Sequence, residues 1–218
     1  MNAPAKLIHE ILPVGWLACN CSIVGDPETR EALVIDPGDD ADEILQVLCR
    51  HNLQAKYIVV THAHIDHVGG LARLKEATGA PVLMHPDDHW LYRNVEMQAA
   101  LIGMPAPRLT AVDQPLRAGD QLCWGKNLCA HVLHTPGHTP GSLSLYLPDP
   151  EKMLFAGDTL FAGSIGRTDL WGGSYEAILR SIHSQLLGLE DATRVYPGHG
   201  PSTTIGEERR RNPFLQGL

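Results

Sequence analysis

The heptapeptide Thr-His-Ala-His-Ile-Asp-His at residues 61–67 decides the fold, because it places three imidazoles and a carboxylate directly after a predicted strand, Tyr57 to Val60. Residues i and i+2 of an extended chain point to the same side, so His62 and His64 can bind one ion. The turn that follows can direct the carboxylate and the last imidazole toward a second ion. A single histidine is more often structural, but four ligand-type residues in this pattern predict a metal site.

Residues remote in sequence must complete this site, because an ion held by imidazoles and carboxylates needs three or four ligands. Three candidates lie beside glycine at predicted strand ends: His138 within His-Thr-Pro-Gly-His-Thr-Pro-Gly-Ser, Asp158 within Phe-Ala-Gly-Asp-Thr-Leu, and His199 within Tyr-Pro-Gly-His-Gly-Pro. Alone, Asp158 is typical of a turn or a cap, and His199 of a loop. Together they supply the missing groups, and the predicted ligands are His62, His64, Asp66, His67, His138, Asp158 and His199.

The order HxHxDH, HTPGHTPGS, GD and GHG along most of the chain resembles the metallo-β-lactamase superfamily. The resemblance implies an α/β (α+β) protein with a four-layer αββα sandwich. It implies one metal bound by His62, His64 and His138, a second bound by Asp66, His67 and His199, and a bridging Asp158. It also matches Asp36, in the motif Val-Ile-Asp-Pro-Gly, to a position that supports the ligands, with a plain turn residue as the alternative.

The predicted elements follow an order that suits such a sandwich. Strands are expected over Leu7 to Pro13, Cys19 to Val24 and Glu31 to Asp36, followed by a helix that ends near Asn52. Further strands are expected at 57–60, 81–84, 121–124, 129–134, 142–147, 153–155 and 194–196, and helices around 71–77, 87–101 and 175–187. Two blocks of mostly antiparallel strands, each followed by helices, predict two sheets packed face to face with helices outside. No linker or repeat interrupts residues 1–218, so we expect a single domain.

Composition and charge exclude several classes of partner. Of 218 residues, 44% are hydrophobic and 19% charged, which is typical of an ordinary globular protein. The formal charge of −8 opposes binding to nucleic acid or to anionic lipid. Met1 to Val14 lacks the apolar region of a signal peptide, and no segment has the length of a membrane span. Five cysteines without a CxxC pair indicate a reduced, cytoplasmic protein whose cysteines are buried as small apolar residues.

Two bound divalent ions favour hydrolysis. Ions roughly 3.5–4 Å apart can bridge a water, lower its pKa toward 7 and polarise the carbonyl that the resulting hydroxide attacks. Zinc is the expected metal, with iron or manganese as alternatives, and Asp66 or Asp158 is the expected proton acceptor. The sequence offers no evident general acid for a leaving amine, whereas a thiol of pKa about 8.5 can depart as a thiolate. A thioester is therefore favoured over an amide.

Within the superfamily, the stretches 161–169 and 203–214 resemble the short bacterial type of glyoxalase II, which is a hydroxyacylglutathione hydrolase. The resemblance implies cleavage of a glutathione thioester such as S-lactoylglutathione. Arg167 matches a basic glutathione contact, and Arg209, Arg210 and Arg211 are further candidates for substrate binding. Longer members continue past the Asn-Pro-Phe motif into a helical region, whereas this sequence stops at Leu218. We therefore expect weaker glutathione binding, and another acyl-thioester is the alternative.

Other readings stay open. A persulfide dioxygenase of the same fold would use one iron bound by His62, His138 and Asp158, a triad suited to oxygen activation. The motif around His199 keeps the hydrolase form instead. Lactone or β-lactam hydrolysis and a catalytically silent metal scaffold are further alternatives, and the oligomeric state is not predicted. His134 is a candidate partner of a ligand. The remaining histidines are expected to be structural or exposed: His9, His51, His85, His89, His131 and His183.

Overall fold

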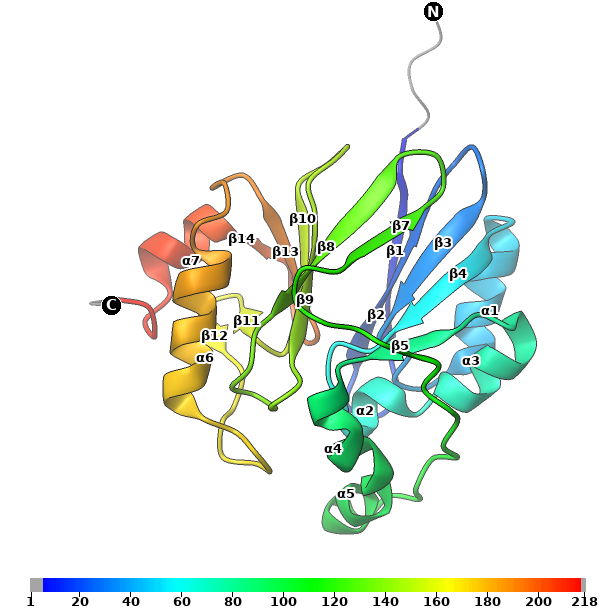
Figure 1. The fold of residues 1–218 in the computed structure, drawn as a ribbon, viewed down its shortest axis with the longest axis horizontal. Coiled ribbons are helices and arrows are strands. Elements are labelled where there is room, and N and C mark those ends of the chain that lie inside the picture. Colours follow the sequence, from blue (N-terminus) through cyan, green and yellow to red (C-terminus); the bar gives the residue numbers. More distant parts are fainter. Residues whose placement is uncertain (1–5, 217–218) are drawn as a thin grey trace, which may run out of the picture.

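Two six-stranded sheets pack face to face and carry helices on their outer faces in the computed structural model, which describes residues 6–216 (Figure 1). The predicted four-layer αββα sandwich is confirmed. Residues 1–5, which belong to the segment without signal-peptide character, and residues 217–218 lie outside the described part.

The first sheet is mixed, with two antiparallel and three parallel pairs of described strands. Its strands follow chain order: β1 (Ile8–Val14), β2 (Cys19–Gly25), β3 (Glu31–Ile35), β4 (Gln54–Val59), β5 (Val82–Met84) and β6 (Gln114–Pro115). β1, β2 and β3 pair antiparallel, but β3 to β6 run parallel. The expectation of a mostly antiparallel block is wrong here, because helical crossovers return the chain to the same end of the sheet. These crossovers contain α1 (Ala41–Arg50), α2 (Ile65–Val68), α3 (Leu71–Thr78), η1 (Pro86–Asp88), α4 (His89–Arg93) and α5 (Val95–Ile102).

The second sheet is antiparallel except at one pair of described strands. Its order is β14 (Thr203–Thr204), β13 (Arg194–Pro197), β10 (Met153–Gly157), β9 (Leu143–Leu147), β8 (Leu128–His134) and β7 (Gln121–Trp124). β10 and β13 are parallel because α6 (Tyr175–Ser181) and η2 (Ile182–Leu186) lie between them in the chain. A small hairpin of β11 (Leu160–Phe161) and β12 (Ser164–Ile165) was not expected, and the charged run 207–211 lies in α7 (Ile205–Arg211).

The inner faces of the two sheets form the central core. Leu33, Val59 and Leu83 of the first sheet pack with Leu143 and Leu145 of the second, and all are buried. Burial of each such side chain contributes roughly 1.5–3 kcal/mol. The Trp124 indole N–H donates to the Val24 carbonyl at 2.9 Å and so joins the sheets by a hydrogen bond as well.

Two predictions about cysteine are wrong. The register of β7 and β8 places Cys123 opposite Cys129, and the structure joins them in a disulfide. Cys49 is exposed on α1, whereas Cys19 and Cys21 are free and buried as expected. The spacing of Cys123 and Cys129 did not predict the disulfide, because a hairpin, and not a CxxC motif, brings these residues together. Among the described residues, no helix is both long and apolar enough to cross a membrane.

Candidate metal centre

Every predicted ligand follows or precedes a strand at the same edge of the sandwich. Residues 61–67 follow β4, His138 lies between β8 and β9, Asp158 follows β10 and His199 follows β13. Because parallel strands end at one edge of a sheet, the topology brings these loops together between the two sheets.

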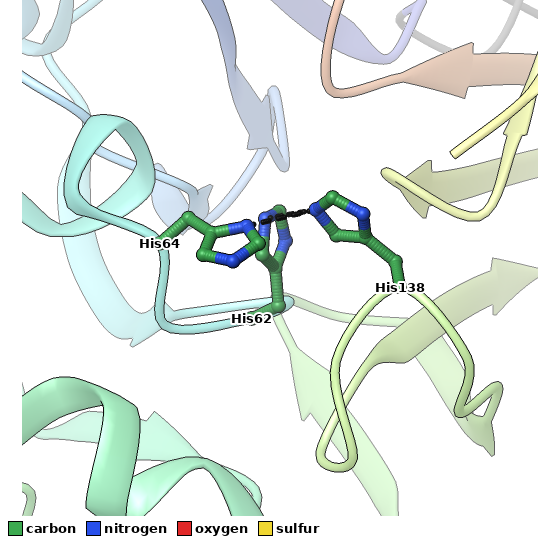
Figure 2. Close-up of side chains that lie close together, drawn as sticks. All are labelled: His62, His64 and His138. Atoms are coloured by element: carbon green, nitrogen blue, oxygen red, sulfur yellow. Dashed lines mark hydrogen bonds between the residues drawn. The ribbon is translucent and has the colours of Figure 1, made fainter. Parts of the chain in front are cut away.

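Three imidazoles converge at the first subsite. The Nε2 atoms of His62 and His138 lie 3.2 Å apart, and His64 Nδ1 lies 2.8 Å from His138 Nε2 (Figure 2). All three side chains are buried. The structure thus brings together the three residues predicted for one metal, with one ligand atom of each close enough to share an ion.

The second subsite contains a carboxylate and two imidazoles. Asp66 Oδ2 lies 3.1 Å from His199 Nε2, and His67 Nε2 lies 3.4 Å from that same nitrogen. These three residues again form a group with ligand atoms within mutual reach.

Asp158 lies between the two subsites. Its Oδ1 is 3.6 Å from His67 Nε2, and its Oδ2 is 3.5 Å from His138 Nε2 and 3.7 Å from His199 Nε2. Asp158 Oδ1 is buried and has no hydrogen-bond partner within the described chain. The preceding Gly157 has φ +50, and a Cβ there would lie 2.5 Å from Thr61 Oγ1, so glycine is needed at the turn that presents the carboxylate.

The protonation pattern shows that these groups fit metal ions. His138 Nδ1 lies 2.8 Å from the Arg167 carbonyl and donates to it, which leaves a lone pair on His138 Nε2. That lone pair faces the ring nitrogens of two other histidines and a carboxylate oxygen. A cation satisfies such converging donors, whereas a buried, unpartnered carboxylate oxygen is otherwise costly.

The electrostatics of the two subsites agree with this fit. Burial and His138 lower the pKa of His64 to about 3, and burial and neighbouring imidazoles hold the pKa of His62 well below its ordinary value. Both are thus neutral, the form that binds metal. Burial disfavours a charge on His67, yet the surrounding carboxylates of Asp36, Asp66 and Asp158 hold its pKa well above the ordinary value. This negative potential favours a cation at the second subsite.

Asp36 supports the second subsite, at the position that the sequence analysis matched to such a role. Its Oδ2 lies 3.0 Å from His67 Nδ1, and both its oxygens accept hydrogen bonds at 2.7 Å from the backbone N–H and the hydroxyl of Thr61. These contacts fix the His67 ring so that Nε2 faces the other ligands. Asp36 itself has φ 52, a strained backbone conformation that the surrounding contacts maintain.

Asp88 and Gln98 also hold the ligand loops, and the sequence analysis missed both. Asp88 Oδ2 accepts from the Ala63 N–H at 2.9 Å and from the Thr139 hydroxyl at 2.8 Å, while Oδ1 accepts from the Gly141 N–H at 2.6 Å. One buried carboxylate therefore connects the loop of His62 and His64 to the loop of His138.

Gln98 also holds the loop of His62 and His64 by hydrogen bonds. Its amide donates to the Ala63 carbonyl at 3.0 Å and accepts from the Ile65 N–H at 2.9 Å. Asp88 and Gln98 both lie in the segment 87–101, which was predicted only as helical. An aspartate at a helix start and a glutamine inside a helix are common, so neither indicates this role in the sequence.

The loop of His199 is held by Asn20. The Asn20 amide donates to the carbonyls of Pro197 and Gly200 at 3.0 and 2.9 Å. His134 takes a similar supporting place beside His138: its Nε2 lies 2.9 Å from the Pro140 carbonyl, and its ring stacks on His85 at 4.3 Å. The two rings are nearly parallel, so their nitrogens cannot point at a common ion although Asp87 lies nearby.

A cavity of about 400 Å³ opens onto the two subsites. Arg167 lines it, and its guanidinium forms two hydrogen bonds with Asp169, at 2.7 and 2.9 Å. The structure does not bring the arginine run to this cavity. Arg209 pairs with Asp191 and donates to the Leu187 and Leu189 carbonyls. Arg210 pairs with Asp191 and with Glu207, and Arg211 pairs with Glu207.

A sequence profile described as the metallo-beta-lactamase superfamily matches residues 14–199. The chain is 37% identical to a protein of Haemophilus influenzae named hydroxyacylglutathione hydrolase GloC, over 94% of this chain and 97% of that protein.

Three solved structures have similar folds. The structure of BLEG-1 B3 metallo-beta-lactamase has a TM-score of 0.89 and 39% identity, covering 96% of this chain and all of that one. The structure of TTHA1623 in a di-iron-bound form has a TM-score of 0.84 and 41% identity, covering 94% and 100%. ETHE1 from Myxococcus xanthus has a TM-score of 0.80 and 31% identity, covering 96% and 85%.

Proposed function

The chain belongs to the metallo-β-lactamase superfamily, and from this premise we propose that it is a binuclear metallohydrolase that cleaves a glutathione thioester such as S-lactoylglutathione. The observation that carries the proposal is the pair of three-residue ligand groups with Asp158 between them. A site for one ion would need only one of these groups.

The proposed roles of the residues follow from their positions. His62, His64 and His138 would hold one divalent ion, Asp66, His67 and His199 would hold the other, and Asp158 would be shared between them. Zinc is the proposed metal, and such a pair activates water and polarises a carbonyl when bound. Asp66 and Asp158, which both line the cavity, are the groups placed to take a proton from the attacking water.

The leaving group is a thiol in this proposal. Among the described residues that line the cavity, the acidic and imidazole groups all belong to the proposed ligand sets, and Arg167 is the remaining ionisable group. No separate acid is therefore placed to protonate an amine, whereas a thiolate can leave without one. The relative named hydroxyacylglutathione hydrolase supports glutathione as the thiol.

Arg167 is the proposed contact for a glutathione carboxylate. Its guanidinium is exposed at the cavity and already binds the Asp169 carboxylate in the two-bond geometry that a substrate carboxylate would use. Arg209, Arg210 and Arg211 would have to leave their partners on α7 and the neighbouring segment to take part.

A persulfide dioxygenase is the second candidate, favoured by the likeness to ETHE1. It would need one ion only, at His62, His138 and Asp158. The closely grouped Asp66, His67 and His199 are the observation that favours the hydrolase.

Metal analysis combined with two activity assays tests the proposal. Purified protein should contain about two equivalents of metal, as a two-metal mechanism requires. It should release thiol from S-lactoylglutathione, lose this activity after treatment with a chelator and regain it with zinc. Oxygen consumption with glutathione persulfide, without thioester cleavage and with one equivalent of iron, would replace the hydrolase by the dioxygenase.

A further inference from the structure

The cavity over the metal centre has an apolar wall. Besides the proposed ligands, Gln98 and Arg167, it is lined by Leu17, Ile65, Leu101, Ile102, Leu170 and Trp171. Leu101 is 65% exposed and Leu17 is 41% exposed. Large apolar side chains exposed together around a polar centre indicate a surface that binds an apolar group.

A second cavity continues this wall away from Arg167. It measures about 230 Å³ and shares Leu17, Ile65, Asp66 and Ile102 with the cavity over the metal centre. Its other walls are the β1–β2 turn, including Trp16, and the segment 104–107 that follows α5. Figure 1 shows α2 and α5 near each other at the lower edge of the sandwich. We call the second cavity, with the apolar residues that it shares with the first, the acyl groove; it is defined by Trp16, Leu17, Ile65, Ile102, Met104 and Pro105.

The charges around the cavities favour an apolar over an anionic occupant of this groove. Arg167 is the only lysine or arginine among the described residues that line either cavity, and it lines the cavity over the metal centre but not the second cavity. Outside the proposed ligand set, the one ionisable residue among the described residues that line the second cavity is Asp39, which is acidic. An anionic group therefore finds no basic side chain in the acyl groove, whereas a hydrocarbon gains by leaving water there.

We infer that the acyl groove binds the aliphatic acyl chain of the substrate, and that the enzyme prefers thioesters whose acyl group is several methylenes longer than lactoyl. The inference rests on the proposed thioesterase function and names its acyl specificity. From a carbonyl held beside Asp66, the substrate can extend in two directions. One direction passes Arg167 and suits a peptide-like thiol with carboxylates, and the other passes over Ile65 into the groove. A lactoyl group is too short to fill the groove.

Each added methylene should raise kcat/KM until the groove is filled. Full burial of a methylene is worth about 0.8 kcal/mol, or roughly fourfold, so a half-open groove should give about twofold per methylene. The measurement is kcat/KM of the metal-loaded protein for acetyl, lactoyl, butanoyl, hexanoyl and octanoyl thioesters of glutathione.

One variant and one matched control test where the chain binds. Ile102 ends α5 and lines both cavities, and it is 36% exposed, so Ile102→Asp places a charge in the groove without burying it in the core. It should abolish the rise of kcat/KM with chain length. Leu109 is similarly exposed, at 39%, and lines neither cavity, so Leu109→Asp should keep the rise.

The outcomes separate this inference from the proposed function. Cleavage of the lactoyl thioester with no gain for longer chains overturns the inference and leaves the thioesterase intact. If no thioester is cleaved, the proposed function fails, and S-alkyl thioethers of glutathione, which cannot be hydrolysed, decide the groove by calorimetric titration. Affinity that rises with alkyl length in the wild type but not in Ile102→Asp supports the groove, and affinity independent of length, or no binding, overturns it.

Discussion

The metal centre and the acyl groove adjoin each other but are built in opposite ways. The proposed ligands His62 and His67 are 1% and 0% exposed, and buried side chains such as Asp36 and Asp88 fix the backbone and rings around them. The groove is formed by exposed and half-buried side chains, of which Trp16 is 74% exposed, mostly from a turn and a segment after a helix.

This difference separates the kind of reaction from the choice of substrate. A braced, buried centre leaves little freedom to its ligands, so a change there should alter metal affinity and kcat. The groove side chains contact solvent on one side, so a change there should alter substrate affinity and leave the fold intact. The predictions below test that division, from the largest expected effect to the smallest.

Substitution of Asp158 should have the largest effect. Asp158→Asn keeps the size of the side chain but removes the anionic bridge between the two subsites. We expect kcat/KM to fall by more than about 100-fold, since even loss of a residue that only supports a ligand costs 10- to 100-fold. Metal content should drop below that of the wild type. Wild-type turnover and metal content in this variant would show that Asp158 does not bridge.

Asp88→Asn should lower metal affinity by about 10- to 100-fold, the range for residues that support metal ligands. Both oxygens of Asp88 accept hydrogen bonds, whereas an asparagine has one acceptor and would direct its amide N–H at a donor such as the Gly141 N–H. Competition with a chromogenic chelator measures the affinity.

The neighbouring residue supplies the control for Asp88. The Asp87 side chain is 58% exposed, so Asp87→Asn makes the same chemical change outside the buried network. Loss of folding stability without loss of metal affinity in Asp88→Asn would show that Asp88 supports the fold alone.

The candidate ligands could be selected from the sequence because their chemistry is encoded locally. Each one lies in a short motif at a strand end, so residue types and spacing single it out without knowledge of the fold, and the structure groups these residues between the sheets. Asp88 and Gln98 were missed because their role depends on which loops lie against η1 and α5 in space. The strand directions of the first sheet were mistaken because the direction depends on the crossovers, which a strand's own sequence does not encode.

The acyl groove and the substrate contacts were the least predictable part of the molecule. The groove combines residues of the β1–β2 turn, of α2 and of the end of α5 with the segment after it, and these separate stretches form no common motif. The arginine run was expected at the substrate because it lies close to His199 in sequence. In the structure, Arg209 instead binds Asp191 and the segment after η2. Nearness along the chain does not place a side chain in a cavity.

Two arginine variants test this contrast. Arg167→Ala should raise KM for S-lactoylglutathione by about tenfold with a smaller change in kcat, because a hydrogen-bonded charge pair contributes about 1.5 kcal/mol. Arg209→Ala should leave KM unchanged, since its guanidinium binds Asp191 and backbone carbonyls away from the cavity. Steady-state kinetics of both variants give the comparison, and a larger rise of KM in Arg209→Ala would place the arginine run at the substrate.

The smallest expected effect on activity comes from His9, which lies on β1 and packs against Phe155 and Tyr196 of the opposite sheet. Burial lowers the pKa of His9 from 6.5 to about 4, assisted by Arg194 and opposed by Glu10. Between these pH values the unfolded chain binds the proton more readily than the folded protein does. Stability should therefore fall as pH decreases from 6.5 to about 4, by at most about 3 kcal/mol at roughly 1.4 kcal/mol per pKa unit.

His9→Leu should remove this part of the pH dependence while keeping an apolar contact between the sheets. Urea unfolding of wild type and variant between pH 7 and 4 measures it, and the difference between the two proteins cancels the contribution of the metal ligands, which they share. His183 is exposed on η2, so His183→Leu should show the wild-type slope. A wild-type slope in His9→Leu as well would assign the acid sensitivity to the metal centre, and pH profiles of activity would then report on folding and catalysis together. A flattened slope would separate them, because acid would then weaken the contact between the sheets through His9, which is not one of the proposed ligands.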